Sequence, residues 1–461
     1  MKSKIPDVIQ SSDAPQFLLI NPPVYDFAMF DLFLKPLGLL KIARILTDMG
    51  NKVFFLDCLA KQDTMTDAIP GIKPVKPRRF GTAKFYQQQI EKPHALKSIQ
   101  RQYYRFGIAG QSIEKKLAEI KKNCPDAVLL TSHMTYWYPG LVEIVRIVRK
   151  VFGNAIPIVL GGIYASLIPE HARKILDIDL ILTGQVSRQR LINEFAKKNI
   201  PINYEKFQEE FINPYFELLE PLDNVILELS KGCSSHCTYC ASHILSGRYH
   251  LNNYEHIFEQ IQHYYSKSIV DYAFYDDALL LNKKNGIIPL LTKIIKNKYF
   301  LRFHTPNGMH INYIDQTLAQ LMWENHFKNL RFGLETVSEK LQLEYGKFIE
   351  MKMLKEKILI LRKAGFKQNE IGFYVLTGLP GQDSEEVRNT ILTVKSLGAR
   401  PIVTEYSPIP FTKLWPKAVK TAAFDIENEP LFHNNTVLAC RNPRLTFDDL
   451  QDLKDLTRLE G

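Results

Sequence analysis

Three cysteines stand close together and have the spacing of a metal-binding loop. The stretch reads Lys231-Gly-Cys-Ser-Ser-His-Cys-Thr-Tyr-Cys240, so the cysteines are Cys233, Cys237 and Cys240. Thiolate is a soft ligand that favours zinc, copper(I) and iron-sulfur clusters. Three thiolates can hold three irons of a 4Fe-4S cluster and leave the fourth open, whereas structural zinc normally takes four ligands, with His236 as the fourth here. The motif predicts a metal centre, and it favours a cluster over a zinc loop.

The other three cysteines are scattered singly at positions 58, 124 and 440. This pattern is not a disulfide framework, and it offers no spacing for a second cluster. We expect Cys58 and Cys124 to be core thiols that behave as small hydrophobic residues. Cys440 lies near the C-terminal end, where a hydrogen donor or a methyl acceptor is a further possibility.

Alternating apolar and amphipathic stretches surround the cysteine motif and must position it. Six strand-helix units are expected between residues 224 and 415, which is fewer than the eight of a closed barrel. Such a series predicts a partial parallel (β/α)6 barrel with its chemistry at the C-terminal ends of the strands. The expected strands are 225–229, 270–275, 300–304, 330–334, 372–377 and 401–406, and the expected helices are 254–265, 286–296, 314–326, 351–364 and 384–396.

The first 200 residues show a second alternating series. Apolar runs at 17–20, 53–56, 127–130, 158–160 and 180–182 predict buried strands, with helices at 37–49, 140–152 and 188–198. This order favours an α/β fold with a doubly wound, Rossmann-like parallel sheet, whose ligand crevice lies at the carboxyl ends of the strands. Residues 1–200 are therefore expected to form one domain, 201–223 a linker, 224–415 the barrel and 416–461 a C-terminal cap.

Residues 61–111 interrupt the first domain with a basic insertion of little periodicity. Nine basic residues and one acid stand between Lys73 and Arg105, so this stretch holds +8 of the net charge of +10. A long loop of this kind is often functional. We expect it to wrap its own domain and to line the substrate entry with positive charge.

The cysteine spacing, with Tyr239 immediately before the last cysteine, resembles that of the radical S-adenosylmethionine (SAM) superfamily. The resemblance implies a 4Fe-4S cluster on the three cysteines, with the open iron chelated by SAM and Tyr239 beside the cofactor. An electron from the cluster would cleave SAM to a 5′-deoxyadenosyl radical, which abstracts hydrogen from a substrate. The protein would orient these cofactors and exclude solvent.

Segments at the other expected strand ends extend this resemblance. Asp276 and Asp277 follow the second strand, where the superfamily contacts the SAM amino group, and a carboxylate can accept from an ammonium. Asn307 and Glu335 follow the third and fourth strands, where polar side chains often contact the SAM carboxylate and ribose. Gly378 closes the fifth strand in a segment that resembles the adenine-binding one.

Two further matches lie nearby. Lys347 matches a lysine common after the glutamate of the fourth strand. The segment Ser407-Pro-Ile-Pro-Phe-Thr412 resembles a Pro-x-Pro-Gly-Thr motif after the sixth strand, but Phe411 replaces the glycine. A tight turn at this place is therefore not implied by the resemblance.

The first domain resembles the cobalamin-binding domain fused to many radical SAM enzymes. Asn21-Pro-Pro23, Pro36-Leu-Gly38 and Asp57 carry the likeness, and the expected cofactor contacts are Ser132, Gly161 and Gly162. The two glycines lack side chains and so allow close approach of a cofactor. The Asp-x-His-x-x-Gly motif is absent, so no histidine ligand to cobalt is expected from it. The alternative is a vestigial domain that binds no cofactor.

Three consecutive aromatic residues, Tyr136-Trp137-Tyr138, follow one of the expected strands. They predict either an aromatic wall against a corrin ring or packing between domains. His133 beside them is a candidate ligand or hydrogen-bond donor, although a lone histidine is more often satisfied by its neighbours.

The favoured function is that of a radical SAM enzyme that methylates an unactivated centre with the help of cobalamin. A cobalamin-free radical oxidation, rearrangement or ring formation is the alternative. Methylthiolation of tRNA is less favoured, because only Cys58 and Cys124 stand upstream of the motif, where that family has a three-cysteine domain. A non-catalytic iron-sulfur regulatory protein is the remaining hypothesis.

The expected partners are an electron donor such as flavodoxin or ferredoxin and an unidentified substrate. Outside the insertion the chain is nearly neutral, so general nucleic-acid binding is not expected. No stretch is long and apolar enough for a membrane span, and the N-terminus lacks a secretory pattern, so a cytoplasmic location is expected.

Overall fold

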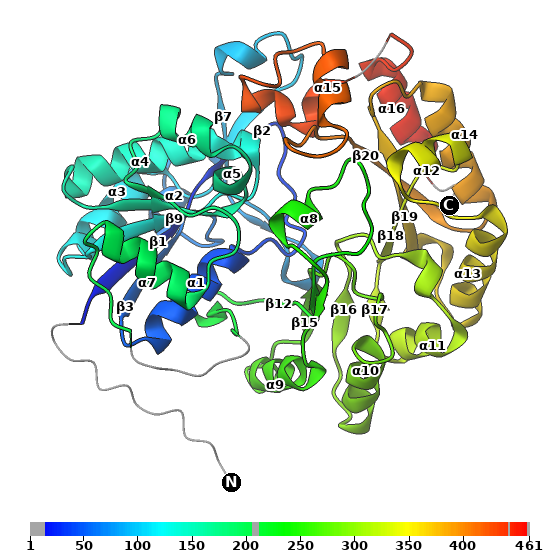
Figure 1. The fold of residues 1–461 in the computed structure, drawn as a ribbon, viewed down its shortest axis with the longest axis horizontal. Coiled ribbons are helices and arrows are strands. Elements are labelled where there is room, and N and C mark those ends of the chain that lie inside the picture. Colours follow the sequence, from blue (N-terminus) through cyan, green and yellow to red (C-terminus); the bar gives the residue numbers. More distant parts are fainter. Residues whose placement is uncertain (1–13, 205–211, 441–442, 459–461) are drawn as a thin grey trace. The chain divides into compact units, whose positions relative to one another are not determined.

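A computed structural model describes residues 14–204, 212–440 and 443–458. The chain divides into two compact units (Figure 1). Unit 1 comprises residues 1–78, 83–93 and 100–222, and unit 2 comprises residues 79–82, 94–99 and 223–461. Among the described residues, no helix combines the length and the apolar character needed to cross a bilayer.

Unit 1 is built on a parallel sheet with the strand order β11-β10-β9-β1-β3. Its strands are β1 (Gln16–Asn21), β3 (Lys52–Asp57), β9 (Ala127–Leu130), β10 (Ile158–Leu160) and β11 (Leu180–Ile181). The order reverses between β1 and β9, so the sheet is doubly wound with its switch point there. The parallel, Rossmann-like sheet that the sequence predicts is confirmed.

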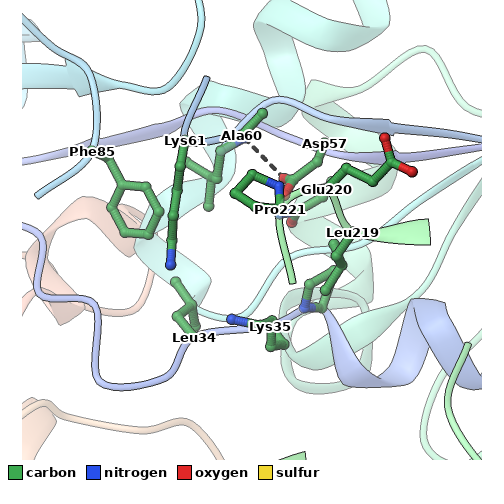
Figure 2. A pocket seen from close by; sticks show the side chains of 12 residues that line it. Leu34, Lys35, Asp57, Ala60, Lys61, Phe85, Leu219, Glu220 and Pro221 are labelled. Carbon is green, nitrogen blue, oxygen red and sulfur yellow. Dashed lines mark hydrogen bonds between the residues drawn. The ribbon is translucent and has the colours of Figure 1, made fainter. Parts of the chain in front are cut away.

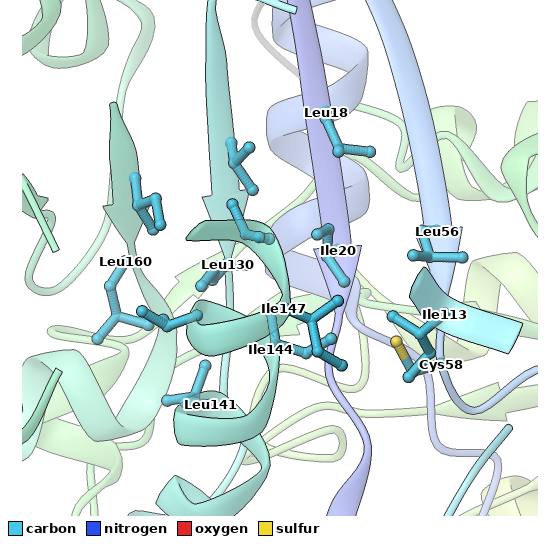
Figure 3. Packing of buried hydrophobic residues seen from close by; sticks show 14 of the residues in the cluster. Leu18, Ile20, Leu56, Cys58, Ile113, Leu130, Leu141, Ile144, Ile147 and Leu160 are labelled. Atoms are coloured by element: carbon cyan, nitrogen blue, oxygen red, sulfur yellow. The ribbon is translucent and has the colours of Figure 1, made fainter. Parts of the chain in front are cut away.

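Helices cover both faces of this sheet, and side chains of β1 alternate between the two cores. Leu18 and Ile20 pack toward one face (Figure 3), and Phe17 and Leu19 pack toward the other. Such two-sided burial explains the continuous apolar runs of the strands. The helices are α1 (Leu37–Asp48), α2 (Thr64–Asp67), α3 (Gly110–Lys121), α4 (Tyr138–Phe152), α5 (Gly162–Leu167), α6 (Pro169–Ile175) and α7 (Arg188–Lys197).

The basic insertion is ordered into antiparallel strands, so the expectation of a long loop without regular structure is wrong. Strands β4 (Ile72–Lys73), β7 (Gln87–Ile90) and β8 (Tyr103–Phe106) join β2 (Val24–Asp26) in the order β2-β8-β7-β4, and β5 (Lys76–Pro77) pairs with β6 (Ala83–Lys84). The strands are short and carry few apolar residues, so their periodicity is hard to detect in the sequence.

Two parts of the insertion belong to unit 2. In residues 79–82, the Phe80 ring lies 4.7 Å from the His304 ring and beneath the Arg302 guanidinium. The Asn224 amide donates to the carbonyls of Phe80 and Gly81. Because Asn224 stands just before the first barrel strand, this segment closes the N-terminal end of that strand.

Unit 2 contains an open barrel of parallel strands. One sheet has the order β12-β15-β16-β17 and the other β18-β19-β20, and a parallel bridge between Met309 and Phe332 joins them. The strands are β12 (Val225–Leu227), β15 (Asp271–Phe274), β16 (Arg302–His304), β17 (Phe327–Lys328), β18 (Leu330–Glu335), β19 (Ile371–Thr377) and β20 (Arg400–Glu405). A short antiparallel pair, β13 (Ser230–Lys231) with β14 (His250–Leu251), flanks the cysteine motif.

The residue ranges of the main barrel helices agree closely with the expected ones. They are α9 (Tyr254–Tyr265), α10 (Ile287–Lys296), α11 (Gln316–Glu324), α13 (Met351–Lys363) and α14 (Ser384–Ser396), and the shorter α8 (Ser242–Leu245) and α12 (Glu339–Tyr345) lie in loops. The C-terminal part adds α15 (Trp415–Thr421) and α16 (Phe447–Leu456). Leu450 and Leu453 of α16 share a core with Val387 and Ile391 of α14, so α16 packs on the outside of the barrel.

The isolated cysteines behave differently from one another. Cys58 is fully buried in the core of unit 1, as expected. Cys124 is exposed, so its prediction as a core thiol is wrong. It lies beyond the end of α3 with a φ of 50°, and there the chain turns toward β9 at the surface. Cys440 is buried, and burial raises the pKa of its thiol to about 12, so it is not poised as a nucleophile.

Candidate functional site

The cysteine loop follows the first barrel strand, and Asp277 at the end of the second strand holds both sides of it. One carboxylate oxygen of Asp277 accepts from the Gly232 N–H at 3.0 Å, and the other accepts from the Ser242 hydroxyl at 2.8 Å. Gly232 directly precedes Cys233, and Ser242 lies two residues beyond Cys240. The acid therefore fixes the distance between the two ends of the motif.

Each cysteine sulfur has a polar neighbour that suits a bound thiolate. The Ser235 N–H donates to Cys233 Sγ at 3.3 Å, and the Ser242 N–H donates to Cys240 Sγ at 3.4 Å. Burial raises the pKa of Cys237, but the Lys347 ammonium and a hydrogen bond with Tyr239 oppose this. Donors to the sulfurs are a means by which proteins set the potential of an iron-sulfur cluster.

The arrangement of the cysteines bears on the kind of metal centre. In the described part of the chain, no three His, Cys, Asp or Glu side chains converge on a point where a single ion would sit. A 4Fe-4S cluster does not require convergence, because each cysteine binds a different iron. The donor set of the loop therefore fits a cluster.

Asp276 supports the strand that precedes the cysteines. Its carboxylate accepts from the N–H groups of Leu229 and Ser230 and from the Ser230 hydroxyl. Burial raises the pKa of Asp276 to about 7, against the lowering effect of these hydrogen bonds. Asp276 and Asp277, which are adjacent in sequence, thus brace two successive parts of the same loop.

We expect Asp277→Ala to weaken the cluster, because it removes the acceptor shared by Gly232 and Ser242. A hydrogen bond to a charged group contributes about 1.5–3 kcal/mol. The variant should incorporate less iron on reconstitution, and its cluster absorbance should decay several times faster in air. Glu259→Ala, which removes an exposed carboxylate of α9, is the matched control and should behave like the parent chain.

The third strand contributes Asn307 and His310. The Asn307 amide donates to the Tyr275 carbonyl at 3.0 Å, which ties the ends of β15 and β16 together, and its side chain is exposed. His310 Nε2 lies 3.8 Å from Cys233 Sγ. Burial lowers the pKa of His310 to about 4, so the imidazole is neutral near pH 7. The sequence did not single out His310, because only the fold brings it to the cysteine loop.

Glu335 and Lys347 form an ion pair of 2.9 Å beside the cysteine loop. Glu335 has a left-handed φ of 69° and lies at an irregularity in the pairing of β18 with β19. Burial lowers the pKa of Lys347, but Glu335, Cys237 and Cys233 raise it further, so the ammonium stays charged. A Cβ at Gly333 would collide with both members of the pair, which explains the glycine there.

The fifth strand ends at Gly378, where the residue has a φ of 83°. A Cβ at this position would come within 2.6 Å of Leu438 Cδ2, so the glycine permits close packing of the C-terminal part. The structure thus gives Gly378 a packing role. The contact of Gly378 with SAM stays a prediction.

Phe411 has a left-handed backbone conformation. Its φ is 65°, and the turn is closed by the Thr412 hydroxyl, which donates to the Ile409 carbonyl at 2.7 Å. The segment thus forms a tight turn in which Phe411 adopts a backbone conformation that glycine favours. A left-handed conformation costs a residue with a side chain roughly 1–2 kcal/mol.

Phe411→Gly should therefore stabilise the protein, by roughly 0.5–1 kcal/mol after the higher entropy of unfolded glycine is subtracted. A small rise in melting temperature would report it. Phe300→Gly is the control, because Phe300 is also exposed but has an ordinary φ. That variant should be neutral or less stable, and an equal effect of both variants would argue against strain at Phe411.

In unit 1, the structure brings Ser132, Gly161 and Gly162 together at the carboxyl ends of β9 and β10. The Ile163 N–H donates to the Ser132 carbonyl at 2.9 Å, and the Ser132 hydroxyl donates to the Met134 carbonyl at 2.9 Å. A Cβ at Gly162 would lie 2.6–2.9 Å from atoms of Thr131 and Ser132, so this glycine is required by the chain itself. Around Gly161 the nearest atom is 3.8 Å away, which leaves room for a ligand.

A small, open pocket lies at the switch point between β1 and β9. His133 and Trp137 line it, and His133 Nε2 is buried without a hydrogen-bond partner. The Trp137 indole donates to Asp26 at 2.7 Å. Tyr136 is buried and Tyr138 stacks on Tyr164, so among the three aromatics only Trp137 lines this pocket.

A second small, open pocket lies on the other side of β1, at the ends of β1 and β3 (Figure 2). Asp57 lies in its wall, where it accepts from the Asn21 amide at 2.7 Å and from the Leu59 N–H at 2.9 Å. Burial raises the pKa of Asp57 above its ordinary value. Lys35 and Lys61 also line the pocket. An unpartnered imidazole nitrogen and two pockets flanking β1 fit a ligand bound at this edge of the sheet.

Residues 227–394 match the family model of the Radical SAM superfamily. This stretch includes the cysteine loop and most of the barrel, whose strand ends carry the acids and the buried ion pair described above. Residues 227–394 of unit 2 therefore form a Radical SAM domain.

Solved structures share the fold of the whole chain. The radical SAM methyltransferase TsrM of Kitasatospora setae, solved with cobalamin and a 4Fe-4S cluster bound, has a TM-score of 0.62 at 13% identity, over 92% of this chain and 81% of that one. The cobalamin-dependent radical enzyme OxsB has a TM-score of 0.56 at 13% identity, over 91% of this chain and 56% of its own. These likenesses confirm the fold class of a Rossmann-like unit joined to a partial radical SAM barrel.

Curated relatives match parts of the chain. A tRNA-2-methylthio-N(6)-dimethylallyladenosine synthase of Bdellovibrio bacteriovorus is 24% identical over 44% of this chain and 46% of its own length. An uncharacterised methyltransferase of Synechocystis sp. is 26% identical over 52% of this chain and 48% of its own. The chain thus spans about half the length of the curated relatives it matches.

Proposed function

We propose that the chain binds a 4Fe-4S cluster through Cys233, Cys237 and Cys240, cleaves SAM reductively and methylates an unactivated carbon or phosphorus centre with the help of cobalamin. The observation that supports this best is the cysteine loop of a Radical SAM domain, in which each sulfur has a polar neighbour. When bound, the reduced cluster supplies an electron to SAM and cobalamin supplies a methyl group.

The residues of the barrel have defined tasks in this proposal. Asp277 holds the loop in shape from both ends. The exposed Asn307 side chain and the charged pair of Glu335 with Lys347 offer hydrogen bonds to the polar groups of SAM. Burial of the pair keeps its hydrogen bonds from competition with water.

The residues of unit 1 would hold cobalamin at the carboxyl edge of its sheet. Gly161 offers open space for a close approach, and the pocket with His133 and Trp137 lies at the switch point, where doubly wound sheets bind their ligands. Asp57 and Asn21 provide polar groups on the other side of β1.

Cobalt, iron and 5′-deoxyadenosine measured on one anaerobic preparation test the proposal. We expect about four irons per chain, as a 4Fe-4S cluster requires, bound cobalamin after expression with ample cobalamin, and 5′-deoxyadenosine after reduction in the presence of SAM. Bound iron without SAM cleavage under any reductant would favour a non-catalytic iron-sulfur regulatory protein. Iron and cleavage without cobalamin would favour a radical oxidation, rearrangement or ring formation.

A further inference from the structure

His310 lies against one of the three cysteines and has no task in the proposed function. Its Nε2 is 3.8 Å from Cys233 Sγ, within reach of a hydrogen bond to sulfur. The residue is partly buried, and its ring packs edge-on against Tyr313, with 6.1 Å between the ring centroids. This packing limits rotation of the imidazole, so the contact with the sulfur is directed.

The backbone next to His310 is held in place by the fourth-strand segment of the barrel. The Met309 N–H donates to the Arg331 carbonyl at 2.9 Å, and the Met309 carbonyl accepts from the Gly333 N–H at 3.1 Å. A Cβ at Gly308 would lie 2.9 Å from the Gly333 nitrogen, so a glycine permits this close approach to β18. The barrel itself therefore positions the histidine.

Cys233 is held as firmly as the histidine. Asp277 accepts from the Gly232 N–H at 3.0 Å, and a Cβ at Gly232, where φ is 73°, would collide with the Arg248 carbonyl. The Ser235 N–H donates to Cys233 Sγ at 3.3 Å. A backbone amide and an imidazole thus share this sulfur, and both are fixed by the fold.

The direction of the hydrogen bond follows from the state of the sulfur. A cysteine bound to iron is a thiolate, which has lone pairs and no hydrogen to donate. A neutral imidazole has one N–H and one bare nitrogen, and a bare nitrogen beside the thiolate would bring two lone pairs together. The bound thiolate therefore selects the form of His310 in which Nε2 carries the hydrogen.

We propose that His310 acts through Cys233: its Nε2–H donates to the cluster-bound sulfur and raises the reduction potential of the cluster. The proposal rests on the proposed function, since it requires a 4Fe-4S cluster on the cysteine loop. Reduction adds one electron to the cluster, and the imidazole keeps its proton. A donor to a cluster sulfur stabilises the more negative, reduced state. His310 thereby helps to determine how strong a reductant SAM cleavage requires.

The test is a potentiometric titration of the reconstituted chain without SAM. Dithionite is the reductant, and electron paramagnetic resonance of the reduced cluster is the readout. His310→Phe keeps an aromatic ring against Tyr313 and removes the donor. The variant should bind as much iron as the parent chain, and the equilibrium constant for reduction of its cluster should fall about tenfold, which is about 59 mV for a one-electron couple. His310→Gln, whose amide retains an N–H, should recover roughly half of that shift.

A second spectroscopic measurement separates a donor from an iron ligand. Electron spin echo modulation of the reduced parent cluster should show a weak coupling to an imidazole nitrogen, and His310→Phe should lack it. A strong nitrogen coupling in the parent chain, together with loss of iron in His310→Phe, would make His310 a ligand and overturn the proposal.

His243→Phe is the matched control. His243 is exposed on α8, three residues beyond Cys240, so the same substitution is made close to the cysteine loop. This variant should keep the potential and the nitrogen coupling of the parent chain.

An unchanged potential in His310→Phe would overturn the proposal, as would an equal shift in His243→Phe. A shift that appears only after SAM is added would also overturn it, because His310 would then act on SAM and not on the sulfur. If the parent chain forms no 4Fe-4S cluster, it is the proposed function that fails. If the potential shifts as expected but the parent chain does not cleave SAM, the proposed function fails and the role of His310 stands.

Discussion

Alanine at Cys233, Cys237 or Cys240 should abolish reductive SAM cleavage. Each sulfur is expected to bind a different iron, so no other side chain can take its place. The loss of activity should exceed the roughly 10–100-fold loss that is typical when a residue hydrogen-bonded to a metal ligand is changed. Iron content, the absorbance of the cluster and the yield of 5′-deoxyadenosine measure the effect.

Two other cysteines provide the controls for this experiment. Cys124→Ala alters an exposed thiol and should change nothing. Cys58→Ala removes a buried sulfur from the core of unit 1, which should lower stability by about 1 kcal/mol but leave SAM cleavage intact. A variant of the three-cysteine loop that retains full iron and full cleavage would contradict the assignment of the cluster.

A bulky side chain at Gly161 should remove cobalamin and leave the cluster in place. Gly161 has an extended backbone, and a Cβ there would meet only the Leu182 carbonyl at 3.8 Å. Gly161→Val is therefore compatible with the fold but occupies the open space at the carboxyl edge of β10. We expect cobalamin affinity to fall more than about tenfold, which is about 1.4 kcal/mol, and methyl transfer to vanish while reductive SAM cleavage persists.

Gly162→Ala is the informative contrast, because the neighbouring glycine is constrained by the chain itself. It has a φ of 90°, and its Cβ would press on Thr131 and Ser132. The variant should lower the melting temperature of the protein, with a strain of about 1–3 kcal/mol. If Gly161→Val binds cobalamin as the parent does, the edge of β10 is not its site. If the parent binds none yet turns over its substrate, the methyltransferase proposal fails.

Regular elements with strong periodicity could be predicted from the sequence. The expected helices at 254–265 and 384–396 coincide with α9 and α14, because their apolar residues recur at helical spacing and Asn253 and Asp383 cap their first turns. The parallel strands of unit 1 were equally clear, since burial on both faces leaves them continuously apolar. The cysteine motif was visible because its chemistry depends on local spacing alone.

Features that depend on contacts between distant segments could not be predicted. The sequence places Asp276 and Asp277 at a strand end, but only the fold shows that their carboxylates are engaged by the loop after the preceding strand. His310 reaches Cys233 from 77 residues away, and no local pattern marks it. The left-handed backbone of Phe411 could not be predicted either, because a residue with a side chain disfavours that region and only the folded turn holds it there.

The path of the chain limits how this protein can be divided. The backbone passes from one unit to the other after residues 78, 82, 93, 99 and 222, so the boundary is crossed five times. A gene cut at codon 222 would take Phe80 away from His304 and from Asn224, which lie in the other half. During synthesis, about 140 further residues must be made before the partners of residues 79–82 exist. Neither unit is therefore one continuous segment of the chain. A chimera that takes its barrel from a relative would also need the basic insertion of that relative.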